Sequence, residues 1–121
     1  MHVCMALGIT LQAETMISSR PPSSPIRVLG IDTSLRSTGV GILDAVGSRL
    51  MPVYFGTVKN PADRPLSACL LHLQESIEKL IQAHEPQAVA IEGVFYAKNV
   101  KTMLILSHAR GAIIAQCARM G

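Results

Sequence analysis

The sequence predicts an α/β fold built on a mixed sheet, and three observations support this. Two short apolar runs, at residues 27–32 and 88–92, each end on an acid and are typical of buried strands. Two further runs, at residues 38–43 and 50–58, follow the first after short links, which favours antiparallel pairing. Apolar residues then recur at helical spacing, which predicts a helix that returns the chain to the sheet.

The first three predicted strands form a meander. Residues 27–32 close on a Thr-Ser turn, and residues 38–43 alternate glycine with apolar side chains, as in a strand that lies close to a neighbouring backbone. A turn containing Gly47 leads into residues 50–58. Pro52, near the start of that run, predicts either an edge strand or the first residues of a strand, because proline cannot donate to the hydrogen-bond ladder.

A helix and a fourth strand follow. We expect Asp63 to cap the helix, with Pro65 in its first turn. Pro86 should end the helix, because the residue before a proline avoids the α region. The helix carries the chain back across the sheet, so residues 88–92 should run parallel to residues 27–32.

A second helix is predicted from Val100 to about Met120. Three antiparallel strands, a helix, a parallel strand and a helix form the opening of a ribonuclease-H-like fold. At 121 residues the chain has room for one modest domain, which we place at residues 26–121. The Pro/Ser-rich segment before it makes residues 1–25 a flexible leader, in which Met16 is an alternative start.

Composition narrows the class of protein. No basic residue precedes the apolar patch near the N-terminus, and no apolar run reaches the length of a membrane span, so we expect a soluble cytoplasmic protein. The net charge of +3 and the pI near 9.0 permit an anionic partner without identifying one. The 3 cysteines are widely spaced among apolar residues, which favours reduced core thiols over a disulfide framework.

Asp32 and Glu92 are the candidate catalytic residues. If their strands lie side by side and parallel, both carboxylates project from the sheet edge where ligands collect in open α/β sheets. Two hard oxygen ligands suit Mg²⁺ or Mn²⁺, which there could activate a water for phosphodiester hydrolysis. The alternative is that Asp32 caps its turn and Glu92 is a solvated strand end. That is the simpler interpretation of either residue alone.

The loop after Glu92 is the candidate DNA-binding segment. It combines half of the chain's aromatic residues with cations, and the candidates are Phe95, Tyr96, Lys98, Asn99 and Lys101. Aromatic side chains can stack on unpaired bases while cations hold phosphates. Alternatively, Phe95 or Tyr96 fills the core at the root of the loop. Arg36, in the turn after the first strand, could hold a phosphate near the acids or be a solvated turn residue.

Several of these segments resemble the RuvC family of Holliday-junction resolvases. The resemblance is carried by Gly30-Ile31-Asp32, Gly39-Val40-Gly41, the string Ala-Ile-Glu-Gly-Val-Phe-Tyr-Ala-Lys-Asn at residues 90–99, and His108-Ala109-Arg110-Gly111. It covers residues 26–121. The chain departs from the family at Thr33-Ser34, where Pro-Gly is usual, and at Gly93, where Gln is usual.

The resemblance implies a ribonuclease-H-like homodimer that nicks four-way DNA junctions with Mg²⁺, together with a branch-migration helicase complex, in recombination and DNA repair. Asp32 and Glu92 fall on the first two metal-binding acids of the family, and Phe95 falls on an aromatic residue that engages bases. The second helix falls on one that contributes to the dimer interface. The family continues with a further strand, a basic stretch and two more catalytic aspartates, so we expect this chain to be an N-terminal portion, truncated at its C-terminus.

Three functions remain open from the sequence. The first is a structure-selective DNA endonuclease, present as an N-terminal portion. The second is a fragment that binds branched DNA or dimerises without cutting. The third is an actin-like ATPase or sugar-kinase half, since that superfamily also opens with Gly-Ile-Asp and a Ser/Thr-rich turn; it gives residues 95–99 no role.

Overall fold

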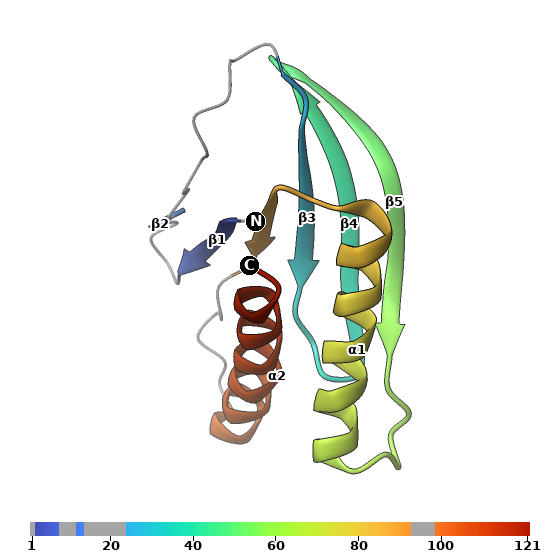
Figure 1. Cartoon of the computed structure of the whole chain (residues 1–121). Helices are drawn as coiled ribbons and strands as arrows, with labels where there is room; N and C mark the ends of the chain where they lie inside the picture. The colour runs from blue at the N-terminus through green and yellow to red at the C-terminus, as the bar shows by residue number, and fades with distance from the viewer. Residues whose placement is uncertain (1, 8–11, 14–23, 93–98) are drawn as a thin grey trace.

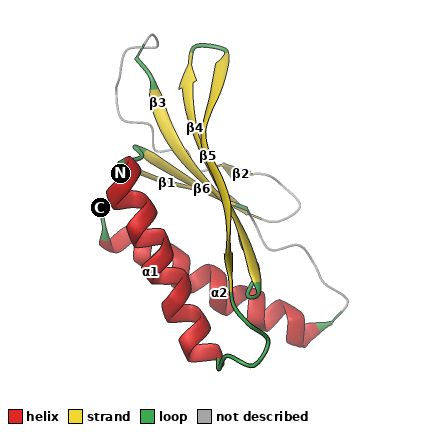
Figure 2. Ribbon diagram, turned by 90° about the vertical axis from the view of Figure 1, so that its right-hand side faces the viewer, coloured by secondary structure: helices red, strands yellow, loops and turns green. Residues whose placement is uncertain are grey.

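The computed structural model describes residues 2–7, 12–13, 24–92 and 99–121, and its sheet has 6 strands in the order β2-β1-β6-β3-β4-β5. Both helices lie against one face of this sheet (Figure 1 and Figure 2). In the described parts of the chain, no helix covers the opposite, open face. The elements are β1 (His2–Leu7), β2 (Gln12–Ala13), β3 (Ile26–Asp32), β4 (Ser37–Val46), β5 (Arg49–Lys59), α1 (Leu66–His84), β6 (Ala88–Ile91) and α2 (Val100–Arg119).

Strands β3, β4 and β5 form the predicted antiparallel meander. Asp32 pairs with Gly39, which in turn pairs with Thr57. The turn between β4 and β5 contains Gly47 at φ 58°, a left-handed conformation that glycine adopts without steric strain. β5 is an edge strand, which is one of the two alternatives for Pro52, and the pairing of β4 with β5 shifts register next to this proline.

Helix α1 presents one apolar face to the sheet. Its buried residues recur every four positions, as an amphipathic helix requires: Cys69, Leu73, Ile77 and Ile81. The helix ends at His84, and Glu85 takes a left-handed conformation (φ 50°) with its N–H bonded to the Ile81 carbonyl. Pro86 follows directly, so the predicted end of the helix is confirmed.

The predicted start of α1 is wrong by two residues. Pro65, not Asp63, is the N-cap residue, and no side chain caps the helix there. Asp63 instead lies in a turn in which the Arg64 N–H donates to the Pro61 carbonyl at 3.1 Å. This turn places the Asp63 side chain before the helix axis begins, so it cannot satisfy the first helical N–H groups.

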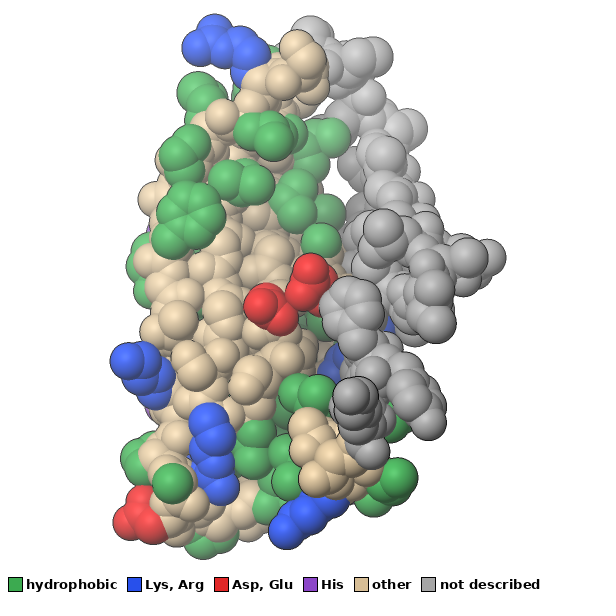
Figure 3. Space-filling view, turned by 180° about the vertical axis from the view of Figure 1, so that it is seen from behind, with side chains coloured by type: hydrophobic (Ala, Val, Ile, Leu, Met, Phe, Trp, Pro, Cys, Tyr) green, Lys and Arg blue, Asp and Glu red, His purple; other side chains and the backbone are tan. Residues whose placement is uncertain are grey.

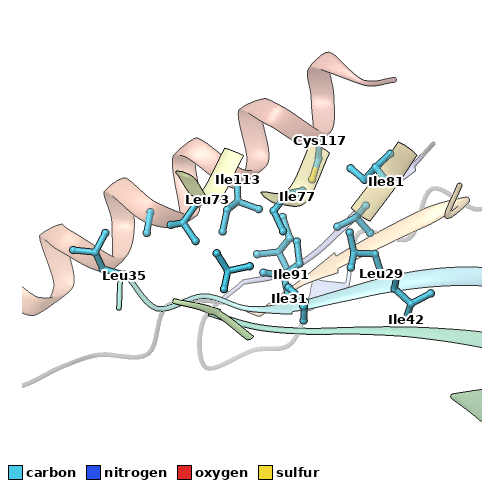
Figure 4. Packing of buried hydrophobic residues seen from close by; sticks show 14 of the residues in the cluster. Leu29, Ile31, Leu35, Ile42, Leu73, Ile77, Ile81, Ile91, Ile113 and Cys117 are labelled. Carbon is cyan, nitrogen blue, oxygen red and sulfur yellow. The ribbon is translucent and has the colours of Figure 1, made fainter. Parts of the chain in front are cut away.

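Strand β6 returns parallel to β3, with Val28 opposite Ala88, as the crossover helix predicted. Helix α2 then packs beside α1, where the Gln74 side chain donates to the Ala112 carbonyl at 3.0 Å. The core between helices and sheet contains side chains from five elements (Figure 4): Leu29, Ile31, Ile42, Leu73, Ile77, Ile81, Val89, Ile91, Ile113 and Cys117. Among the residues that the structure describes, no helix is both long and apolar enough to cross a membrane.

The N-terminal leader differs in part from its predicted flexible state. Strand β1 pairs in parallel with β6, from His2 opposite Ala88 to Met5 opposite Ile91, and β2 pairs with β1. β6 would otherwise present unpaired N–H and C=O groups as an edge strand, and a nearby apolar stretch can satisfy them. The predicted leader therefore contains two strands, while a domain boundary at residue 26 stays a prediction.

An ion pair braces the start of β3, at the opposite end of the strand from Asp32. Arg27 donates from Nε and Nη2 to the two carboxylate oxygens of Asp44, at 2.8 and 2.9 Å. Its Nη1 donates to the His84 carbonyl at the end of α1, at 3.1 Å. The hydrogen bonds from Arg27, together with its positive charge, hold the pKa of Asp44 below its usual value.

We expect Asp44→Asn to lower the melting temperature at neutral pH. Because folding lowers the pKa of Asp44, its stabilising contribution is complete above the unfolded value of about 3.9 and is lost as the pH falls through the folded value. The gap between variant and wild type should therefore close in thermal scans taken below about pH 4. Asp63→Asn, in the exposed turn before α1, is the control. A gap that stays constant with pH would contradict this assignment.

Candidate metal centre

The two candidate acids emerge side by side from neighbouring parallel strands. Asp32 is the last residue of β3, and Glu92 directly follows β6. Ile31 pairs with Ile91, and the Glu92 N–H donates to the Ile31 carbonyl at 3.1 Å. Figure 3 looks onto the open face and shows acidic side chains gathered near its centre. The structure thus brings the two exposed acids together, and their catalytic role stays a prediction.

The two carboxyl groups interact directly. The hydrogen bond with Asp32, and after it the negative charge of Asp32, raises the pKa of Glu92 above its usual value. The pair therefore holds a proton more tightly than an isolated carboxylate does, because two adjoining negative charges repel each other. Asp32 and Glu92 would hold a cation only with both carboxyls ionised, so its positive charge would offset this repulsion.

A groove of about 600 Å³ opens on the same face beside the acids. Its floor is largely backbone, because small residues occupy neighbouring positions of β3, β4 and β6: Gly30, Gly39, Gly41 and Ala90. Phe55 of β5, which is 67% exposed, borders the groove, and a Cβ atom on Gly41 would lie only 3.1 Å from its ring. The groove leaves the acids accessible to a ligand from this face.

Buried polar side chains hold the turn that follows Asp32. The Thr38 hydroxyl accepts from the Ser34 N–H at 3.3 Å and donates to the Ser34 carbonyl. Asn60, just after β5, donates from Nδ2 to the Leu35 carbonyl at 2.9 Å. Both side chains are almost fully buried. The sequence revealed neither role, because both side chains bond to the main chain, and the Asn60 contact also joins positions 25 residues apart.

The six residues predicted to bind DNA differ from one another in their contacts and exposure. Arg36 contacts the protein itself, since its Nη1 donates to the Pro61 carbonyl at 2.6 Å. The Asn99 side chain caps α2 by accepting from the Lys101 N–H at 2.9 Å, and Lys101 is exposed in the first turn of that helix. Phe95, Tyr96 and Lys98 lie outside the described residues. A DNA-binding role for these six residues stays a prediction.

One further residue reaches the site from α2. The Nε of Arg110 donates to the main-chain carbonyl of Glu92 at 3.2 Å, and Arg110 is half-buried. The motif His108-Ala109-Arg110-Gly111 contained this residue, but the sequence assigned it no role. Helical periodicity could not reveal a contact that spans 18 residues.

The pair of carboxylates fits a divalent cation of the Mg²⁺ class. Proteins usually hold Mg²⁺ through one or two carboxylates, with waters and substrate phosphates as the other ligands. Within the described ranges, no group of three or more His, Cys, Asp or Glu residues is placed to hold a metal. If a cation binds here, Asp32 and Glu92 would hold it next to the groove, and this role stays a prediction.

Comparison with known proteins identifies the family of this chain. The family model for crossover junction endodeoxyribonuclease RuvC matches residues 28–121. The protein of that name from Magnetococcus marinus is 41% identical over 99 residues, which are 82% of this chain and 55% of the relative. Its counterpart from Erythrobacter litoralis is 43% identical over 94 residues, 78% of this chain and 58% of the relative. This chain thus spans little more than half the length of these curated relatives.

Solved structures show the same fold. Thermus thermophilus RuvC in complex with a Holliday junction substrate superposes with a TM-score of 0.71 at 18% identity, over 78% of this chain and 59% of that one. The Aquifex aeolicus PPX-GPPA enzyme shares the fold more distantly, with a TM-score of 0.51 at 16% identity over 74% of this chain and 34% of that one. The ribonuclease-H-like fold is confirmed, and the family match decides against the actin-like alternative. By its sequence and its fold, the chain belongs to the RuvC family of crossover junction endodeoxyribonucleases.

Proposed function

We propose that this chain forms the metal-binding part of a nuclease that resolves four-way (Holliday) junctions in recombination and DNA repair. The observation that carries the proposal is the pairing of Asp32 with Glu92 at the ends of two neighbouring parallel strands, in a chain of the RuvC family. Relatives are named crossover junction endodeoxyribonucleases, and one structural neighbour was solved with a Holliday junction substrate.

The proposed cofactor is Mg²⁺, with Mn²⁺ as a substitute of similar chemistry. When bound, such an ion activates a water and stabilises the charge that develops on a phosphodiester. Asp32 and Glu92 hold the ion, and Glu92 must release its tightly held proton for this to happen. Binding therefore strengthens as the pH rises through the raised pKa of Glu92.

The proposed contacts with DNA combine cationic and aromatic side chains. Lys101 is exposed at the start of α2 and can hold a phosphate, and the net charge of +3 favours an anionic partner. Phe95, Tyr96, Lys98, Asn99 and Arg36 complete the proposed DNA-binding set. A homodimer through α2 is supported by the exposure of Val100 (70%) and Leu104 (57%) on that helix. A cytoplasmic location and a helicase partner are carried over from the family.

A second function, junction binding without cutting, is favoured by one observation. The described residues bring together two carboxylates and no third metal-ligating side chain. The in-line displacement of a phosphodiester commonly uses two metal ions about 4 Å apart, which need more ligands than two carboxylates.

A single experiment separates the two functions. A labelled synthetic four-way junction is incubated with the full chain in Mg²⁺ and in EDTA, and gel shift and nicking are read from the same samples. Paired symmetric nicks that require Mg²⁺ are expected for the nuclease, with a linear duplex of the same sequence as the control. A gel shift without nicks would support the binding function. If a folded chain gives neither nicks nor a gel shift, both proposed functions are contradicted.

A further inference from the structure

The main chain at Glu92 is anchored from two sides. On one side, the Glu92 N–H donates to the Ile31 carbonyl of β3 at 3.1 Å. On the other, the Glu92 carbonyl accepts from the Nε of Arg110 on α2 at 3.2 Å. Glu92 lies just beyond the end of β6, so the regular strand pairing of residues 88–91 does not include it. The peptide groups before and after its Cα atom are therefore held by two different elements.

The surroundings of Arg110 differ from those of a surface arginine. Its helix neighbour Ala109 is fully buried, and its own Nη2 is buried without a hydrogen-bond partner among the residues that the structure describes. Burying part of a guanidinium group opposes folding unless the group is well paired. An arginine on a solvated part of α2 would carry no such penalty. The partial burial of Arg110 therefore opposes folding, and a functional role explains its presence there better than a contribution to stability does.

Arg110 does not act as a counter-ion in the described structure. The ion pair found there joins Arg27 with Asp44, and Arg110 contacts Glu92 through its carbonyl rather than its carboxylate. The Glu92 carboxylate is left to interact with Asp32. An arginine suits this role, because its planar group offers a directional Nε–H and keeps its charge at all relevant pH values.

We propose that Arg110 is a positioning residue of the metal centre. It fixes the main chain of Glu92 and so directs that carboxylate toward Asp32 and a shared cation. The inference rests on the proposed metal-binding function, which it deepens by adding a residue from α2. It gives the arginine of the Ala-Arg-Gly segment a role that neither helix propensity nor core packing explains.

The test uses Arg110→Ala in the full chain, with Arg119→Ala in the exposed last turn of the same helix as the matched control. The first measurement is amide hydrogen exchange by NMR without metal. We expect exchange at Glu92 to accelerate roughly 10-fold or more, as its hydrogen-bonded anchor is released. Exchange at Val89, buried in the middle of β6, should not change. The second measurement is Mn²⁺ affinity, which should fall about 10- to 100-fold, as for other partners that orient a metal ligand.

The outcomes separate this inference from the proposed function. Unchanged exchange at Glu92, or equal acceleration at Val89, would overturn the positioning role. Faster exchange at Glu92 with unchanged Mn²⁺ affinity would also overturn it. If Arg110→Ala does not fold, Arg110→Lys is judged by the same measurements, because it keeps the charge but lacks the Nε donor. A wild-type chain that binds no Mn²⁺ would overturn the proposed function itself and the inference with it.

Discussion

Replacing Asp32 by asparagine should nearly abolish divalent-cation binding while making the folded chain more stable at neutral pH. Asp32 supplies one of the two carboxylates, so the loss of Mn²⁺ affinity should be roughly 100-fold or more, above the range seen when only a supporting residue is removed. At the same time the substitution removes the Asp32 carboxyl, whose hydrogen bond and then negative charge raise the pKa of Glu92, so this pKa should return toward its usual value. Titration calorimetry and carboxyl NMR measure the two effects.

The stability change of Asp32→Asn has a defined pH dependence. A carboxyl whose pKa is raised by folding stabilises the folded state at low pH, and this contribution is lost as the pH rises through the raised value. Above it, the wild-type chain carries two repelling carboxylates, so the melting temperature of the variant should be the higher one. The advantage should disappear below about pH 4, where Glu92 is protonated in both states. Asp63→Asn should change neither metal affinity nor the pKa of Glu92. Unchanged Mn²⁺ binding in Asp32→Asn would remove Asp32 from the site.

Leu73→Ala should destabilise the chain by about 2–5 kcal/mol, the usual result of truncating a fully buried leucine. Leu73 of α1 is 0% exposed and belongs to the core cluster together with Ile77 and Ile113 (Figure 4). A small domain has a total stability of only about 5–15 kcal/mol, so the loss is a large part of it. Denaturant unfolding followed by circular dichroism measures the shift of the midpoint.

Leu71→Ala is the matched control for this substitution. Leu71 lies two positions away on the same helix and is 55% exposed, so the same change in side chain should alter stability by about 0.5 kcal/mol or less. Equal losses in the two variants would mean that α1 does not present the face containing Leu73 to the sheet.

Much of the fold could be predicted because local patterns determine it. The helical spacing of Leu73, Ile77 and Ile81 identifies the buried face of α1, and Pro86 marks its end. A crossover helix then forces β6 to run parallel to β3. From this topology alone, the acids that end the two strands must meet, and the structure places Asp32 beside Glu92.

Contacts between distant positions could not be predicted in this way. Asn60 holds the turn after Asp32 by donating to the Leu35 carbonyl, 25 positions away, and sequence patterns do not identify a main-chain acceptor. The contact of Arg110 with the Glu92 carbonyl could not be predicted for the same reason, since its acceptor is also a main-chain carbonyl of a distant residue. The prediction that Asp63 caps α1 was wrong because residues 61–64 form a turn instead. The preference of Asp for helix caps does not decide between a cap and a turn. The pairing of β1 with β6 depends on an available strand edge, which a reading of the leader alone does not reveal.

The most direct test of the metal centre is a titration of the ¹⁵N-labelled chain with Mn²⁺, followed by NMR. The paramagnetic ion broadens the amide signals nearest to it. We predict that broadening begins at Asp32, at Gly39 opposite it, and at Glu92, and that excess Mg²⁺ reverses it. Broadening that begins instead at exposed acids elsewhere, such as Asp63 or Glu75, while Asp32 and Glu92 stay sharp, would contradict the assignment of the metal centre.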